Sequence, residues 1–157
     1  MRGIAIKLQN YEHQSAVDVL NAHLRTAREN GGLVFFSTNL RVSSRQGNIS
    51  ALLLCFPTPS GSLGYLQADI VKIVQGDRQK FIPSDAGTYS PPEYSDTPCA
   101  TWLLIQNLRR ADPQFLSQIM VTASNGENVH LTEIFTRSPR LNRVYWWLNT
   151  SDDGLIF

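Results

Sequence analysis

The chain has 157 residues, of which 42% are hydrophobic and 17% are charged, and its formal net charge is +1 at pH 7. This composition is typical of a globular domain and excludes a disordered chain, and the small net charge argues against a polyanion binder that acts through bulk charge alone. Its longest apolar runs are far shorter than the ~20 residues that cross a bilayer. We therefore expect one domain over residues 1–150, a frayed tail at 151–157, a cytoplasmic location and no membrane partner.

The N-terminal part predicts a strand followed by a helix. Apolar residues alternate with small or polar ones over Gly3–Leu8, which is typical of a half-buried strand. Apolar residues then recur at helical spacing after Ser15, which is a suitable N-cap. We expect this helix to end at Gly31 or Gly32, because a glycine can adopt the left-handed conformation that satisfies the last carbonyls.

The most informative stretch follows that helix. An unbroken apolar run, Leu33–Phe36, predicts a buried central strand. It stops abruptly at three small hydrogen-bonding side chains, Ser37, Thr38 and Asn39. These residues form either the edge of a polar pocket or an ordinary exit from a strand into a loop.

Two further strands and a long irregular segment come next. The runs Ile49–Phe56 and Leu63–Val74 are joined by a tight connection, so we expect them to pair antiparallel, with a bulge or a close backbone approach at Gly64. Residues 76–98 contain four prolines and show no periodicity. Irregular segments of this length tend to cover binding sites or to be poorly ordered, and the aromatic residues here favour an ordered cover.

The C-terminal part predicts a strand, two short helices and a closing strand. Thr101–Leu108 is apolar and rich in strand formers, and Asp112 before a proline is typical of a helix start. Leu131–Phe135 predicts a short helix that Pro139 ends. Arg143–Leu148 predicts an aromatic strand, in which alternation directs its two adjacent tryptophans to opposite faces, so that one of them belongs to the core.

The residues give no positive indication of catalysis. Cys55 and Cys99 lack a nearby cysteine or a histidine at zinc-finger spacing, and we expect them to be buried free thiols. His130 and Glu133 have the spacing of metal ligands, but two ligands do not make a site. We therefore predict no metal and no cofactor, and whether the chain is an enzyme stays open, with a non-enzyme favoured.

A binding function has more support. Most basic residues are arginines, whose planar guanidinium suits phosphate, and the chain also offers aromatic faces and small polar side chains. Together these match the stacking surface, the edge partners and the phosphate contacts that recognition of an unpaired base requires. The candidate base pocket is Ser37, Thr38, Asn39, Trp102, Tyr89 and Tyr94, and the candidate phosphate contacts are Arg41, Arg45, Arg109, Arg110, Arg140 and Arg143.

The order of these elements resembles the PUA-like superfamily, particularly its EVE and YTH-like branch. The similar parts are Leu33–Asn39, the strand pair Leu52–Phe56 with Gly64–Val74, and Thr101–Trp102 leading towards Arg109. The resemblance implies an α+β fold with a small, curved, mostly antiparallel β-barrel flanked by two or three helices. It also implies that DNA or RNA is the partner, recognised through a modified or unmodified base in an aromatic pocket that includes Ser37–Asn39 and Trp102.

Two alternatives stay open. An exposed aromatic patch around Tyr145–Trp147 would suit a protein-interaction or self-assembly domain, for which the sequence gives no oligomeric state. A ribonuclease-type hydrolase on the same fold is less favoured, because the chain lacks the Gly-x-Lys-x-x-Glu-x-Arg signature of the ASCH branch.

Overall fold

The structure is a computed structural model, and it describes residues 1–10 and 13–149. The expected tail at 151–157 lies outside the described residues. In chain order the elements are β1 (Arg2–Lys7), α1 (Ala16–Glu29), β2 (Leu33–Thr38), η1 (Ser44–Gln46), β3 (Ala51–Pro57), β4 (Leu63–Gln75), α2 (Ala86–Tyr89), β5 (Thr101–Arg110), α3 (Pro113–Ser117), β6 (Ile119–Thr122), β7 (Asn128–His130), α4 (Leu131–Arg137) and β8 (Arg143–Leu148).

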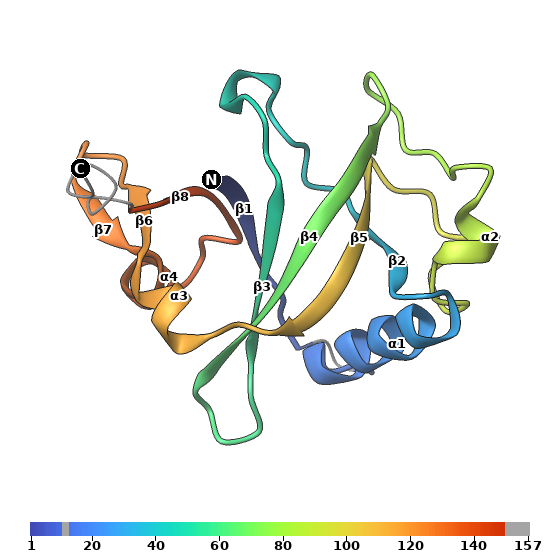
Figure 1. The fold of residues 1–157 in the computed structure, drawn as a ribbon, viewed down its shortest axis with the longest axis horizontal. Helices are drawn as coiled ribbons and strands as arrows, with labels where there is room; N and C mark the ends of the chain where they lie inside the picture. The colour runs from blue at the N-terminus through green and yellow to red at the C-terminus, as the bar shows by residue number, and fades with distance from the viewer. Residues whose placement is uncertain (11–12, 150–157) are drawn as a thin grey trace, which may run out of the picture.

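The strands form one mixed sheet in the order β2-β5-β4-β3-β1-β8-β6-β7 (Figure 1). The β1–β3 pair is parallel, and the other pairs are antiparallel. The expected α+β class and the mostly antiparallel sheet are thus confirmed. Within residues 1–10 and 13–149 no ladder joins β2 to β7, so the sheet is not closed and the expected barrel is not confirmed. The described part of the chain contains four α-helices, rather than two or three.

The sheet bends along β4 and β5. The first half of β4 pairs with β3, and its register with β5 shifts twice, between Gln67 and Asp69 and between Ile70 and Lys72. Asn107 on β5 lies opposite the first shift and adopts a positive φ of 59°. Such irregularities increase the local twist and bend the strands. The second half of β4 therefore curves away from β3 together with β5, on the side of the sheet that carries β2 (Figure 1).

Gly64 is not the site of the expected bulge. It pairs in regular register with Phe56 on β3, and the Phe56 ring lies over it, because a Cβ at this position would be only 2.6 Å from Phe56 Cζ. The alternative expectation of a close approach at this glycine is the correct one, although the approaching group is an aromatic side chain rather than backbone.

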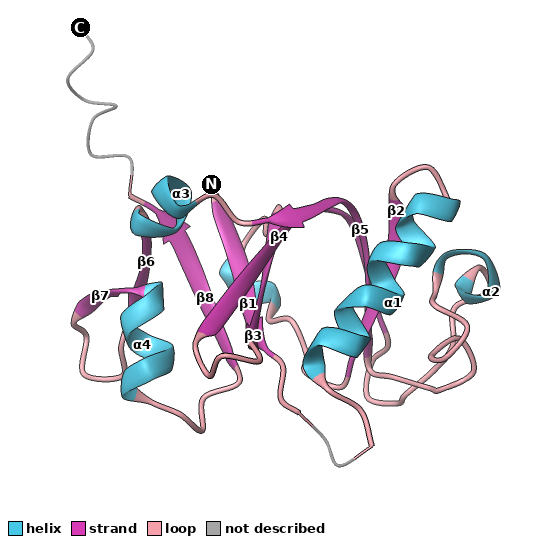
Figure 2. Ribbon diagram, turned by 90° about the horizontal axis from the view of Figure 1, so that it is seen from below, coloured by secondary structure: helices cyan, strands magenta, loops and turns pink. Residues whose placement is uncertain are grey.

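Helix α1 begins and ends where the sequence predicts. Ser15 and Asp18 form a reciprocal capping box, and after the helix Gly31 and Gly32 take φ values of 64° and 92°. Its apolar face packs across β2 and β5 (Figure 2). This position sets the helix beside the end of β2. No helix in the described ranges is long and apolar enough to span a membrane.

Strand β1 is buried on both faces, not half-buried as expected. Ile4 and Ile6 belong to the core cluster under α1, whereas Ala5 belongs to a second cluster formed with β6, α4 and β8. The strand lies between β3 and β8, so both of its edges are paired as well. The alternation of small and large apolar residues along β1 therefore reflects two buried faces, one that takes large side chains and one that takes small ones.

The C-terminal half contains three elements that the sequence pattern did not predict. Ile119 opens β6 rather than extending α3, and its side chain is fully buried. β7 forms a hairpin with β6, and α2 is a single helical turn inside the irregular segment. Elements of three or four residues are too short to establish a period.

The structure confirms three other predictions, namely the antiparallel pairing of β3 with β4, the strand β8 and the buried free thiols of Cys55 and Cys99.

Candidate functional site

An open cavity of about 540 Å³ lies where β2 ends, between the ends of β1 and α1 and the segment that contains Tyr94. Its volume falls within the roughly 300–1,000 Å³ of typical small-ligand sites. It holds four of the six residues expected in a base pocket, namely Ser37, Thr38, Asn39 and Tyr94. The remaining lining residues are Ile6, Lys7, Leu8, Gln9, Gln14, Val19, His23, Phe36, Leu40 and Asn142.

The inner wall of the cavity is aromatic and includes a buried histidine. The His23 ring stacks on Tyr94, with centroids 5.6 Å apart and planes 21° apart, and it meets Phe36 at 5.4 Å. His23 Nδ1 lies 2.7 Å from the carbonyl oxygen of Val19, one helical turn earlier. Burial lowers the pKa of His23, although the Val19 hydrogen bond and the charge of Glu93 oppose this. His23 is therefore neutral at physiological pH.

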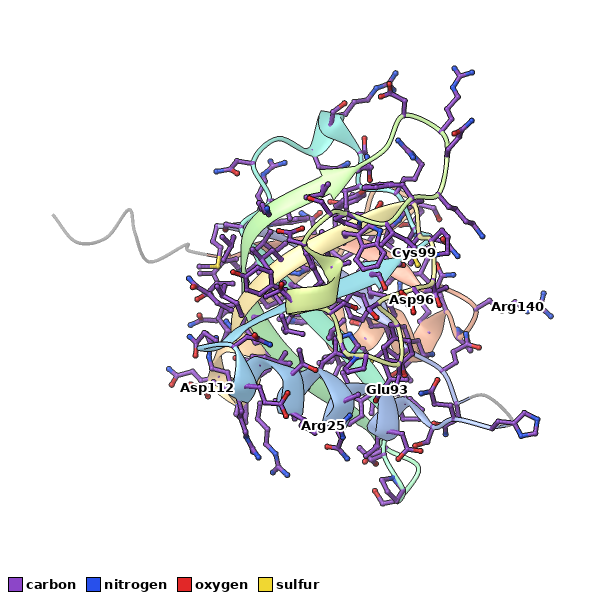
Figure 3. All side chains as sticks on the ribbon, turned by 90° about the vertical axis from the view of Figure 1, so that its right-hand side faces the viewer. Arg25, Glu93, Asp96, Cys99, Asp112 and Arg140 are labelled. Atoms are coloured by element: carbon purple, nitrogen blue, oxygen red, sulfur yellow. The ribbon has the colours of Figure 1, made fainter. Side chains whose placement is uncertain are left out.

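Tyr94 is held against α1 by two further contacts. Gln14 Nε2 donates a hydrogen bond to the Tyr94 hydroxyl. Arg25 on α1 forms a 2.9 Å ion pair with Glu93, the residue before Tyr94 (Figure 3). Burial also raises the pKa of Tyr94, so its hydroxyl stays protonated. These contacts place an aromatic face at the cavity mouth by means of a segment distant in sequence from α1.

The polar residues at the end of β2 are fixed by local hydrogen bonds. Thr38 Oγ1 accepts from the backbone N–H of Leu40 at 3.1 Å, which turns the chain out of the strand. Asn39 Oδ1 accepts from the N–H of Ala100 at 3.3 Å. Because the amide oxygen of Asn39 is occupied, its Nδ2 group remains as a donor on an exposed side chain. Ser37 lines the cavity as well.

Gln75 at the end of β4 secures the loop that follows. Its Oε1 accepts from Val42 N at 2.8 Å and from Thr101 Oγ1 at 2.7 Å, and its Nε2 donates to Val42 O at 3.1 Å. One side chain thus joins this loop to β4 and β5. The loop carries the cavity residue Leu40, so Gln75 contributes to the shape of the cavity from outside it.

Two of the candidate phosphate contacts lie together beside the cavity. Arg41 follows Leu40 and donates to Gly76 O at 2.5 Å, and the Arg143 guanidinium donates to the carbonyl oxygen of Arg41. Asn142, which precedes Arg143, lines the cavity, as does Lys7. Of these three basic residues Lys7 lines the cavity, whereas Arg41 and Arg143 each follow a lining residue in the sequence.

The other candidate arginines do not join them. Arg45 lies in η1, and Arg109 donates to Asn107 O on its own strand at 2.7 Å. Arg110 lines a different groove, between α1 and the β3–β4 hairpin. Arg140 projects away from the body of the molecule (Figure 3). The six arginines do not form a single patch, because they are spread over η1, the end of β5, the start of β8 and the connections after β2 and α4.

Trp102 does not line the cavity. It is fully buried, in a core cluster with Phe35 and Leu104, and its indole N–H donates to the carbonyl oxygens of Phe81 at 2.9 Å and Cys99 at 3.3 Å. Tyr89 packs against the same cluster and meets Phe35 edge to face. Both residues therefore hold the 81–99 segment against β2 and β5. Their expected role as base-stacking surfaces has no support in this position.

The aromatic patch expected at Tyr145–Trp147 is also reduced. Trp146 is 1% exposed, which makes it the core member of the tryptophan pair, as alternation required. The Tyr145 hydroxyl accepts a hydrogen bond from Ser43 N at 2.8 Å. Tyr145 and Trp147 are both half-buried on this strand, and the Tyr145 hydroxyl is already engaged.

His130 and Glu133 do not belong to a larger cluster of possible metal ligands among the described residues. His130 is the N-terminal cap residue of α4, and Glu133 pairs with Arg137 at 2.5 Å. Within residues 1–10 and 13–149 there is no group of three or more His, Cys, Asp or Glu side chains that could hold a metal ion.

The sequence pattern did not indicate that His23 and Gln14 line the cavity. A signal for His23 was present, since it falls on the same helical stripe as Ala16, Leu20 and Ala27, which are all buried. Comparisons of the chain with protein-family models, with curated proteins and with solved structures gave no match.

Proposed function

We propose that this protein is a non-catalytic nucleic-acid-binding module that holds one base, modified or unmodified, in the cavity at the end of β2. The observation that carries the proposal is the convergence of Ser37, Thr38, Asn39 and Tyr94 on one open cavity of about 540 Å³. These residues come from two segments that are far apart in the sequence. A PUA-like assignment, with its curved barrel, belongs to the same proposal.

The chemistry of the cavity suits an unpaired base. A base offers two flat faces and a hydrogen-bonding edge, and single-strand binders meet these with aromatic side chains and polar groups. Tyr94 provides the aromatic face, while Ser37 and Asn39 provide hydroxyl and amide groups. The cavity is reached from solvent, so a base that is single-stranded or flipped out of a duplex fits it better than a paired one.

Basic residues near the cavity supply the third requirement of base recognition, which is contact with phosphate. Lys7, Arg41 and Arg143 come from three elements beside the cavity and would meet the phosphates that flank a bound base. A cluster of this size predicts a moderate dependence on salt. It also agrees with a chain whose net charge is only +1.

Fluorescence anisotropy of labelled oligonucleotides tests the proposal. Single-stranded and double-stranded DNA and RNA, with and without a modified base, are titrated at about 50 and about 200 mM salt. We expect single strands to bind and to weaken at the higher salt. Tyr94→Ala should reduce affinity about tenfold, because base stacking contributes roughly 1–3 kcal/mol per base.

A matched pair of asparagine variants separates the cavity from the general surface. Asn39→Ala removes a cavity donor, whereas Asn48→Ala changes an exposed loop residue that does not line the cavity. We expect weaker binding only for the first. If the wild-type protein binds no oligonucleotide at either salt concentration, the proposal is wrong. Self-association in sedimentation that Trp147→Ala abolishes would then favour the protein-interaction alternative.

A further inference from the structure

Two side chains that line the cavity, His23 and Gln14, each keep a hydrogen-bond acceptor beyond their other contacts, and for His23 the role of that acceptor is fixed. His23 Nδ1 lies 2.7 Å from a carbonyl oxygen, which can only accept, so Nδ1 carries the proton. In the neutral ring Nε2 then has a lone pair and no proton. Nε2 has no hydrogen-bond partner among the described residues, and it is not among the fully enclosed unpaired atoms.

The second acceptor belongs to Gln14. Its Nε2 donates to the Tyr94 hydroxyl, which leaves Oε1 as an acceptor on a side chain that also lines the cavity. Gln14 and His23 both contact Tyr94, one at the hydroxyl and the other across the ring face. Two acceptors are thus gathered around the same aromatic side chain.

A pair of acceptors discriminates between bases by their exocyclic groups. A primary amino group carries two N–H donors and can donate to both acceptors at once. A carbonyl oxygen in the same place would face lone pairs on both sides and would leave His23 and Gln14 unpaired. Leaving buried polar groups unpaired is the strongest means of rejecting a near-isosteric ligand.

On this basis, and resting on the proposed function, we propose that the cavity selects a base with an exocyclic primary amino group, which donates to His23 Nε2 and Gln14 Oε1. Cytosine and uracil form the sharpest comparison, because they differ only in an amino group against a carbonyl, with the accompanying change of ring protonation. His23 is then a residue that determines specificity rather than a structural member of α1.

The test compares labelled oligo-dC and oligo-dU of equal length, which have the same backbone and charge. We expect the wild-type protein to bind oligo-dC about tenfold more tightly, because paired hydrogen bonds to a base edge discriminate between bases. His23→Phe keeps an aromatic ring between Tyr94 and Phe36 but has no acceptor. This variant should lose the preference for cytosine.

Two more variants keep the outcome decisive. His23→Gln restores an acceptor and should recover part of the preference, whereas His13→Phe makes the same change at an exposed histidine and should leave the preference intact. Thermal unfolding shows whether each variant is folded. Equal binding of the two oligonucleotides by the wild type, or an unchanged preference in His23→Phe, overturns the inference while the proposed function stands. Absence of binding to both overturns the two together.

Discussion

Ser37 and Trp102 are direct partners across the β2–β5 ladder, yet Ser37 lines the open cavity and Trp102 is fully buried. Opposite residues of an antiparallel pair direct their side chains to the same face of the sheet. The difference between them arises because the 81–99 segment covers β5 at Trp102 and accepts its indole hydrogen bonds. The boundary between core and cavity therefore passes between these two paired residues.

Replacement of Trp102 should affect stability rather than the chemistry of binding. We expect Trp102→Ala to lower the free energy of unfolding by about 3–5 kcal/mol, because it removes a large buried side chain. Trp102→Phe should cost less and chiefly leave the carbonyl oxygens of Phe81 and Cys99 without their donor. Urea unfolding measures both. Trp147→Phe at a half-buried site is the control, and an equal loss there would contradict the assignment of Trp102 to the core.

Gly3 should not tolerate a side chain. A Cβ on Gly3 would lie 2.1 Å from Trp146 Cζ2 and 2.6 Å from the carbonyl oxygen of Ala51. Relief of this overlap requires movement of a buried ring and of β3, so we expect Gly3→Ala to lower the free energy of unfolding by about 1–3 kcal/mol or more.

Gly87→Ala is the matched control for the Gly3 prediction. No atom lies within 4 Å of a Cβ at Gly87, which is in the short helix α2, so this change should be neutral or slightly stabilising. Thermal unfolding measures the melting temperatures of the two variants, and we expect that of Gly3→Ala to be lower. Similar melting temperatures for both would show that the β1–β8 contact is looser than the structure indicates.

Local signals were sufficient for much of the fold. The capping residue Ser15, the glycines after α1 and the apolar run of β3 each act over a few residues, and the structure confirms the elements that they predict. The same holds for β8, where alternation correctly placed one tryptophan of the pair in the core.

The burial of Trp102 and Tyr89 depended on information that a local pattern does not hold. Their side chains are covered by the 81–99 segment, which has no periodicity and whose path is set by tertiary contacts. The aromatic composition of that segment correctly indicated an ordered cover. It did not indicate that the tyrosines would separate, with Tyr89 packed on the core and Tyr94 at the cavity.

The polar half of the site was predicted in part. Ser37, Thr38 and Asn39 do line a cavity, but the residues that complete it with them come from α1 and β1. His23 occupies the apolar stripe of α1, where a histidine needs a partner for its ring nitrogen, and Val19 one turn earlier supplies it. That combination is recognisable in a sequence only once the helix is known to face a cavity.

The neutral state of His23 should make stability depend on pH. Burial lowers the pKa of His23 below its ordinary value of 6.5. As the pH falls below about 6.5, His23 of the unfolded chain binds a proton while His23 of the folded protein does not, so the free energy of unfolding decreases. This contribution is complete above the unfolded pKa and is lost as the pH falls towards the lowered folded pKa.

Urea unfolding at about pH 7.5 and about pH 5.5 measures this effect, because the two values lie on either side of the ordinary histidine pKa. His23→Phe has no titrating group at this position and should lose less stability between the two values. Changes of equal size in the wild type and in His23→Phe would show that His23 is protonated as easily in the folded protein as in the unfolded chain.

Gln75 should act on the cavity from a distance. Gln75→Leu removes the three hydrogen bonds that join Val42 and Thr101 to β4. We expect a loss of about 1–3 kcal/mol in the free energy of unfolding, because part-buried polar groups lose their partners. We also expect weaker oligonucleotide binding, since Leu40 and Arg41 lose their support. Gln79→Leu, at an exposed position in the segment that follows β4, should change neither quantity.

Alanine variants of Arg143 and Arg140 test whether Arg143 contacts a phosphate or is only a basic surface residue. Both are near the end of the chain, but Arg143 donates to the Arg41 carbonyl beside the cavity, whereas Arg140 projects away (Figure 3). Removing one phosphate contact lowers the slope of log affinity against log salt by about 0.7 for a single strand. We expect this change for Arg143→Ala, together with a uniform loss of affinity across oligonucleotide sequences, and no change for Arg140→Ala. Equal slopes in the two variants would remove Arg143 from the phosphate contacts, and a loss confined to one base sequence would place its guanidinium on the base instead.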